Sequence, residues 1–107
     1  MPLKLRLSSS DRRAVECGRP ILLLDKGNGN NTVVSSHRTS GNAYQAAVVL
    51  DKLHGYARDL SATQLHDLAT AMCERLYFQS DYDCLPLSKQ LALLEAARVE
   101  LRSRRRF

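Results

Sequence analysis

The pattern of hydrophobic and polar residues divides the chain into an extended N-terminal part and a helical C-terminal part. Residues 2–7 alternate leucine with a basic residue, which is the period of a half-buried strand. A serine run, an early aspartate and the closing Gly18 predict a short helical turn over residues 11–18 with a serine as its cap. Residues 21–24 and 32–34 are apolar or β-branched, so they predict two further strands.

Asn28 and Gly29 stand between these two strands and form the preferred pair for a two-residue type I′ turn. A turn at this place sets two cross-strand pairs: Leu24 with Val33, and Leu23 with Val34. The two pairs lie on opposite faces, so the hairpin is apolar on both. A central position in the sheet, or an interface on the second face, would explain this pattern. The stretch lacks the third glycine of a dinucleotide-binding loop and the lysine of a P-loop, so we interpret it as a turn.

From Ser40 onward the hydrophobic period becomes that of helices. The first predicted helix carries an apolar stripe of five residues: Ala46, Leu50, Leu53, Ala57 and Leu60. Its internal Gly55 is interpreted as a point of close helix packing. Ser61 and Gln64 form a capping box that begins the second helix. The stripe of that helix is Leu65, Leu68, Ala69, Met72 and Leu76, and Tyr77 and Phe78 end it.

Pro86 and Ser88 mark the start of a third helix. Its predicted stripe is Leu87, Leu91, Leu94 and Leu101, with Ala97 beside it and Arg98 interrupting it. Strands therefore come first and helices after, which predicts an α+β fold: N-terminal antiparallel strands with a β-hairpin, followed by three α-helices. A chain of 107 residues is the size of one domain, which we place at residues 1–101 with a basic C-terminal tail at 102–107.

The net charge of +5 is concentrated at the C-terminal end, because five of the sixteen Lys and Arg residues lie between 98 and 107. The remainder of the chain is nearly neutral. The tail supports an alternative function, nucleic-acid binding, through its four arginines: Arg102, Arg104, Arg105 and Arg106. No predicted helix has a basic face, and no aromatic residues alternate with cations as a single-strand platform requires.

Composition and cysteine spacing indicate a folded cytoplasmic protein. Hydrophobic residues make up 44% of the chain and charged residues 25%, which are values of globular domains. No segment approaches the ~20 apolar residues of a membrane span, and the N-terminus lacks the apolar region of a secretion signal. The three cysteines, Cys17, Cys73 and Cys84, are widely spaced and form no C-x-x-C pair. They are therefore expected to be free thiols in a reducing compartment.

The candidate catalytic residues do not form a pattern in the sequence. His37, His54 and His66 share no helical spacing and are expected at the surface. Cys84 is the best placed thiol, but Asp81 and Asp83 beside it should raise its pKa. We therefore expect no enzyme activity, no metal and no cofactor.

The remaining chemistry is that of protein association. Surplus apolar surface on a small domain is typical of docking and of two-fold dimers. The expected anchors are aromatic and aliphatic side chains around the end of the second helix: Met72, Leu76, Tyr77, Phe78 and Tyr82. The sequence thus predicts a small non-enzymatic regulatory or adaptor protein, a homodimer that binds another protein. Inhibition of a transcription factor or of an assembly, by masking its oligomerisation surface, is the mechanism we consider.

Overall fold

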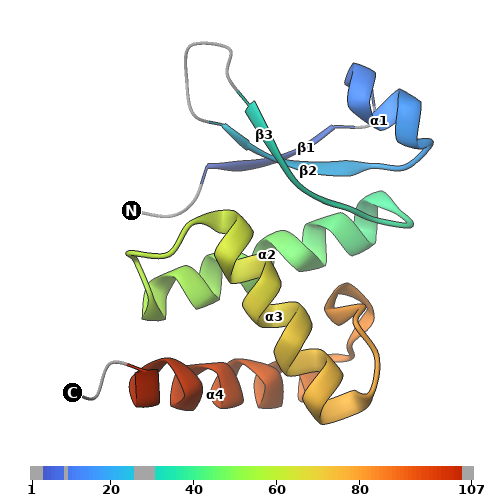
Figure 1. Ribbon diagram of the computed structural model, residues 1–107. Helices are drawn as coiled ribbons and strands as arrows, with labels where there is room; N and C mark the ends of the chain where they lie inside the picture. Colours follow the sequence, from blue (N-terminus) through green and yellow to red (C-terminus); the bar gives the residue numbers. More distant parts are fainter. Residues whose placement is uncertain (1–3, 9, 26–30, 105–107) are drawn as a thin grey trace.

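The computed structural model describes residues 4–8, 10–25 and 31–104, and it has the predicted α+β order (Figure 1). A three-stranded sheet lies over α2 and α3, and α4 lies on the far side of these two helices. The elements are β1 (Leu5–Ser8), α1 (Arg12–Cys17), β2 (Ile21–Asp25), β3 (Asn31–Ser36), α2 (Ser40–Tyr56), α3 (Ala62–Tyr77), the short 3₁₀-helix η1 (Tyr82–Cys84) and α4 (Leu87–Arg104). Antiparallel strands followed by three long helices confirm the predicted fold class.

The register of the β2–β3 hairpin differs from the prediction. Near the turn, Leu23 pairs with Val33 and Leu24 with Thr32, each one position away from the expected partner. The register shifts between Leu22 and Leu23, so that one residue of β3 is inserted as a bulge. Asp25 pairs with Asn31, whereas the predicted turn would pair it with Thr32. The predicted turn at Asn28 and Gly29 lies outside the described residues.

Both faces of β2 are buried, because this strand is central and each face has its own cover. The strand order is β1-β2-β3, with antiparallel pairing throughout. Leu22 belongs to the main core formed with the long helices. Ile21 and Leu23 face the other way and pack with Ala14 of α1. A central position therefore explains the two apolar faces, and α1 covers the second one.

The short helix α1 is present as predicted, but its cap is different. Asp11, and not a serine, accepts a hydrogen bond from the backbone N–H of Arg13. The Ser8 hydroxyl instead accepts from the N–H of Asp11, one turn before the helix. Gly18 closes α1 at φ 68°, where residues other than glycine are strained.

Helices α2 and α3 bury most of the predicted stripes. Helix α2 ends at Tyr56, so Ala57 and Leu60 lie beyond it, and Leu76 of α3 is exposed. Thr39 caps α2, and the capping box of Ser61 and Gln64 begins α3 with both of its hydrogen bonds formed. A Cβ atom added at Gly55 would meet nothing within 4 Å. The interpretation of Gly55 as a close packing point is therefore wrong, because this position faces open space.

The buried face of α4 is rotated from the predicted stripe. Leu87 and Leu91 are exposed, with 66% and 53% of their surface accessible. The buried positions are Gln90, Leu93, Leu94, Ala97 and Leu101. The leucines of this segment fit more than one helical stripe. Contact with α2 and α3 selects the stripe that contains Leu93, Leu94 and Leu101. Helix α4 also continues to Arg104, so the basic tail predicted from residue 102 begins inside the last helical turn.

Candidate functional site

The end of α3 exposes an aromatic ring on a strained backbone. Phe78 is the C-cap of α3 at φ 57°, in the left-handed region where glycine is usual. A residue with a side chain loses about 1–2 kcal/mol in this conformation. The ring of Phe78 is 93% exposed, and Leu76 in the preceding turn is also exposed. We call Leu76 and Phe78 the α3 patch.

Tyr77 lies beside this patch but is turned toward α4. Its hydroxyl donates a hydrogen bond to the carbonyl oxygen of Lys89 at 3.3 Å. The Lys89 ammonium lies 5.0 Å from the centre of the Tyr77 ring, within the range of a cation–π interaction. Tyr77 therefore holds the end of α3 against the first turns of α4 and gives the α3 patch a rigid base.

The structure does not bring all five predicted anchors to one surface. Met72 and Tyr82 are buried in the main core. A partner could reach them only after the fold opens, so both are corrected from docking residues to core residues. The three aromatic residues predicted as one cluster therefore lie in three different environments. Tyr77 contacts α4, Phe78 is exposed, and Tyr82 lies in the core.

A buried hydrogen-bonded series joins β3 to η1. The Ser35 Oγ atom lies 2.5 Å from Nε2 of His37, and Nδ1 of His37 lies 2.7 Å from Oδ2 of Asp83. Burial pushes the pKa of Asp83 up, but the hydrogen bond and charge of His37 bring it below its ordinary value. An ionised Asp83 only accepts, so Nδ1 of His37 donates to it. Nε2 of His37 is paired with the Ser35 hydroxyl.

A second histidine contacts the neighbouring residue of η1. Nδ1 of His66, on α3, lies 2.7 Å from the hydroxyl of Tyr82, and the two rings are tilted with centroids 5.5 Å apart. Burial lowers the pKa of His66, and the nearby His37 lowers it further while Asp67 opposes the shift. Two consecutive residues, Tyr82 and Asp83, are thus each held by a histidine from another element. We call Ser35, His37, His66, Tyr82 and Asp83 the η1 network.

The expectation that the histidines lie at the surface is therefore wrong for His37 and only partly right for His66, which is half-buried. The order of atoms from Ser35 through His37 to Asp83 is the one that activates serine in acyl transfer. Here Ser35 is 9% and His37 is 4% exposed, so their contacts chiefly fasten the end of β3 to η1. No sequence signal predicted this series, because Asp83 is 46 residues from His37.

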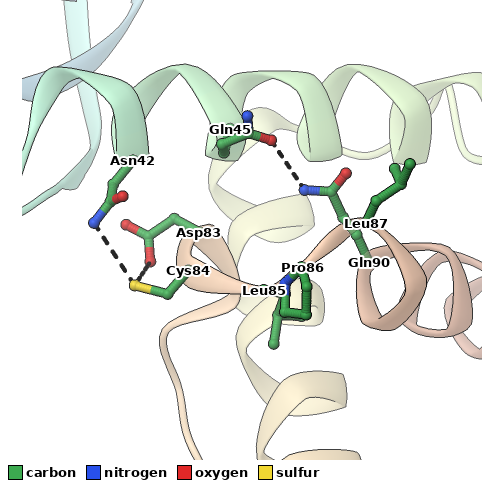
Figure 2. Close-up of a pocket in the computed structure, with 8 residues that line it drawn as sticks. All are labelled: Asn42, Gln45, Asp83, Cys84, Leu85, Pro86, Leu87 and Gln90. Carbon is green, nitrogen blue, oxygen red and sulfur yellow. Dashed lines mark hydrogen bonds between the residues drawn. The ribbon is translucent and has the colours of Figure 1, made fainter.

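A hollow of about 430 Å³ lies between α2 and the start of α4 (Figure 2). Eight residues line it: Asn42, Gln45, Asp83, Cys84, Leu85, Pro86, Leu87 and Gln90. At one end Asn42, Asp83 and Cys84 converge, with the thiol within 3.5 Å of Oδ1 of Asp83. At the other, Gln90 donates to Gln45 at 3.2 Å.

The thiol in this hollow is poorly suited to catalysis. Burial, the charge of Asp83 and its hydrogen bond together raise the pKa of Cys84, so the thiolate is disfavoured. The predicted direction of this shift is confirmed, although burial contributes more than the carboxylates. Among the described residues, no group of three or more His, Cys, Asp or Glu side chains is arranged to hold a metal ion.

The basic end of α4 is partly neutralised within the chain. Glu100 contacts two arginines, Arg75 and Arg104, each at 3.5 Å. Arg102 is exposed on the last turn of the helix and makes no ion pair within residues 4–8, 10–25 and 31–104. Arg105 and Arg106, the other two predicted nucleic-acid contacts, lie outside the described residues.

Comparison of the chain with protein-family models, curated proteins and solved structures found no match. Within the described part of the chain, no helix has the length and apolar character needed to cross a membrane. The features of this chain that can carry a function are therefore the α3 patch, the η1 network and the surface of α4.

Proposed function

We propose that this chain is a small non-enzymatic regulatory or adaptor protein that acts by binding another protein. The observation that carries the proposal is Phe78, whose ring is exposed and whose backbone is strained at the same residue. Neither feature stabilises the isolated chain. A partner that buries the ring would compensate for both, and strained residues are enriched at binding sites.

The α3 patch fits a partner with a shallow apolar pocket. Leu76 and Phe78 project from a helix end that the Tyr77–Lys89 contact holds in place. A rigid anchor loses little conformational freedom on binding, which favours affinity from a small area. The mechanism we propose is inhibition of a transcription factor or of an assembly, by insertion of this patch into the surface through which it oligomerises. We propose that the chain acts as a homodimer.

The chemistry of the described residues supports a non-enzymatic role. The Cys84 thiol has a raised pKa, and the Ser35 hydroxyl is buried against His37. The three cysteines are free, and two of them, Cys17 and Cys84, are exposed. Exposed free thiols are stable in a reducing compartment, so we propose a cytoplasmic location.

The test of this function is loss of a partner in a variant that folds at least as well as the natural chain. Phe78→Gly removes the ring and also relieves the backbone strain, so stability should rise while capture of the partner from lysate is lost. Tyr44→Ala is the matched control, because Tyr44 is another exposed aromatic residue on a different helix. Capture of the same proteins by natural chain and Phe78→Gly would contradict the proposal.

Nucleic-acid binding through the basic end of α4 is the alternative function. The observation in its favour is Arg102, which is exposed on the last turn of α4 and makes no ion pair with any residue that the structure describes. Affinity for duplex DNA should then fall steeply with salt, and replacement of Arg102, Arg104, Arg105 and Arg106 by glutamine should abolish it. Nuclease treatment during the capture experiment separates the two functions, because it removes only those partners held through nucleic acid.

A further inference from the structure

Helix α4 is covered on one side only. Its buried residues face α2 and α3, and Figure 1 shows α4 at the margin of the molecule with no described element beyond it. The opposite side carries exposed residues at helical spacing: Ser88, Leu91, Ala92, Glu95 and Val99. We call these five residues the outer row of α4.

The outer row is unusually apolar for an exposed helix surface. Leu91 is 53% and Val99 is 57% exposed, and the small Ser88 and Ala92 allow close approach of another helix. Its single charge, Glu95, lies at the centre and pairs with Arg98 of the same helix. A polar outer side would be expected for a helix that has no partner.

The composition of the outer row is suited to contact with itself. Leu91 and Val99 lie four residues before and four residues after Glu95. When two such helices pack antiparallel about a two-fold axis at Glu95, Leu91 of each copy meets the partner's Val99. Two apolar contacts then flank a charged centre, and both are produced by the same symmetry operation.

The charges of α4 favour this antiparallel arrangement over a parallel one. Each Glu95 comes within one turn of the partner's Arg98, so two carboxylates and two guanidinium groups form a neutral cluster. Arg102 comes opposite the partner's Ser88, which is uncharged, and the two basic helix ends are far apart. In either arrangement the two Glu95 carboxylates meet near the centre, where Arg98 of both copies offsets them. Parallel packing in register would also place Arg102 beside the partner's Arg102, and the antiparallel arrangement avoids this repulsion.

From this complementarity we infer that the outer row of α4 is the surface on which two copies of the chain associate, antiparallel, with Glu95 at the two-fold axis. The inference deepens the proposed homodimer and rests on it. It is independent of the α3 patch, since Leu76 and Phe78 are not part of the outer row.

Charge variants mixed with one another test this surface. Glu95→Arg and Arg98→Glu each place like charges around the axis, so each variant alone should associate at least about tenfold more weakly than the natural chain. Mixing the two variants in equal amounts should restore association, because one copy is then basic and the other acidic at the axis. The Glu95–Arg98 pair within a chain is lost in both variants, and mixing does not restore it. Recovery on mixing therefore reports contact between chains, which sedimentation velocity measures directly.

An apolar variant gives a second measurement. Leu91→Ser should weaken self-association, whereas Leu87→Ser should not, because Leu87 is an exposed leucine of the same helix that faces the α2–α4 hollow. Circular dichroism checks that both variants fold. A natural chain that is monomeric at all concentrations would overturn both the interface and the homodimer. A dimer that ignores the charge variants and Leu91→Ser would overturn this interface and leave the homodimer standing.

Discussion

At the scale of the residue, Gly55 and Phe78 each occupy a backbone position that another residue type would stabilise. Alanine would suit the position of Gly55, and glycine would suit that of Phe78. Gly55 is the penultimate residue of α2, where an added Cβ atom would meet nothing within 4 Å, so the absence of a side chain serves no contact there. Phe78 occupies a left-handed cap where glycine would be unstrained. Substitution of Gly55 can therefore raise stability without loss of contacts. Phe78, in contrast, combines a strained backbone with an exposed side chain. The two positions therefore predict opposite trade-offs between stability and binding.

Gly55→Ala should raise the free energy of unfolding by about 1 kcal/mol, because alanine restricts the unfolded chain and fits the helix. Urea denaturation measures this change. Gly18→Ala is the control of opposite sign: at φ 68° the same methyl group should destabilise the protein by about 1–2 kcal/mol. A loss of stability in Gly55→Ala would show that this position is not open in solution.

Ser35→Ala should lower the free energy of unfolding by about 1–3 kcal/mol, because Nε2 of His37 then lacks its buried partner. Ser36→Ala is a suitable control, since Ser36 is the adjacent exposed residue of β3. A fluorophosphonate probe should not label Ser35 in the folded chain, because the hydroxyl is buried. Labelling of Ser35 that disappears in His37→Ala would indicate a reactive serine and count against the non-enzymatic proposal.

At the scale of the element, α4 shows how packing selects one stripe from several. Its leucines at 87, 91, 93, 94 and 101 allow alternative buried faces. Contact with α2 and α3 buries Leu93 and Leu94 and leaves Leu87 and Leu91 at the surface. The hairpin shows a related effect, because the bulge near Leu22 changes the register within a single strand pair. In both cases the nearby sequence determines whether the segment is a helix or a strand. Packing against other elements determines which face is buried and which residues pair.

Leu93→Ala should therefore cost about 2–5 kcal/mol of stability through loss of buried contacts and the cavity left behind. Leu87→Ala should change stability by less than about 0.5 kcal/mol, because the side chain is mostly in solvent. Thermal or urea unfolding of the two variants at one protein concentration makes the comparison. Equal losses would mean that the predicted stripe, and not the observed one, faces the core.

At the scale of the whole molecule, the η1 network joins parts of the chain that are far apart in sequence. Strand β3 contributes Ser35, and His37 directly follows the end of that strand. Helix α3 contributes His66. His37 and His66 contact η1 directly, and Ser35 is joined to it through His37. The 3₁₀-helix η1 also packs against α2. A single short segment thus links the sheet layer with the helical layer. Protonation within this network should consequently affect the stability of the entire fold.

Stability should fall as the pH is lowered below about 6.5, the ordinary pKa of histidine. Burial lowers the pKa of His66 in the folded state, so the unfolded chain binds a proton first as pH decreases. The contribution of His66 is thus complete above the unfolded pKa and is lost as pH falls through the folded one. Asp83, with its lowered pKa, adds a second loss at more acidic pH.

Unfolding free energies measured across this pH range test the effect. His66→Gln should reduce the slope below pH 6.5. His54→Gln, at a histidine of α2 outside the η1 network, is the matched control. An unchanged slope in His66→Gln would show that His66 is not the group that links stability to pH.

The sequence by itself determined the local structure of this protein. The alternation of residues 2–7, the apolar runs of the hairpin and the capping box at Ser61 act over a few residues. Their hydrogen bonds and side-chain periods are set by near neighbours along the chain, so the α+β order could be predicted without coordinates.

Only the tertiary structure decided which surfaces remain open and which polar groups meet. Tyr82 and Met72 carry the same aromatic or apolar signal as Phe78, yet they are buried because α2, α3 and η1 converge on them. The contact of His37 with Asp83 requires two segments that no short-range pattern relates. Burial and long-range hydrogen bonds depend on how the layers pack, and periodicity states which side chains are apolar without stating what covers them.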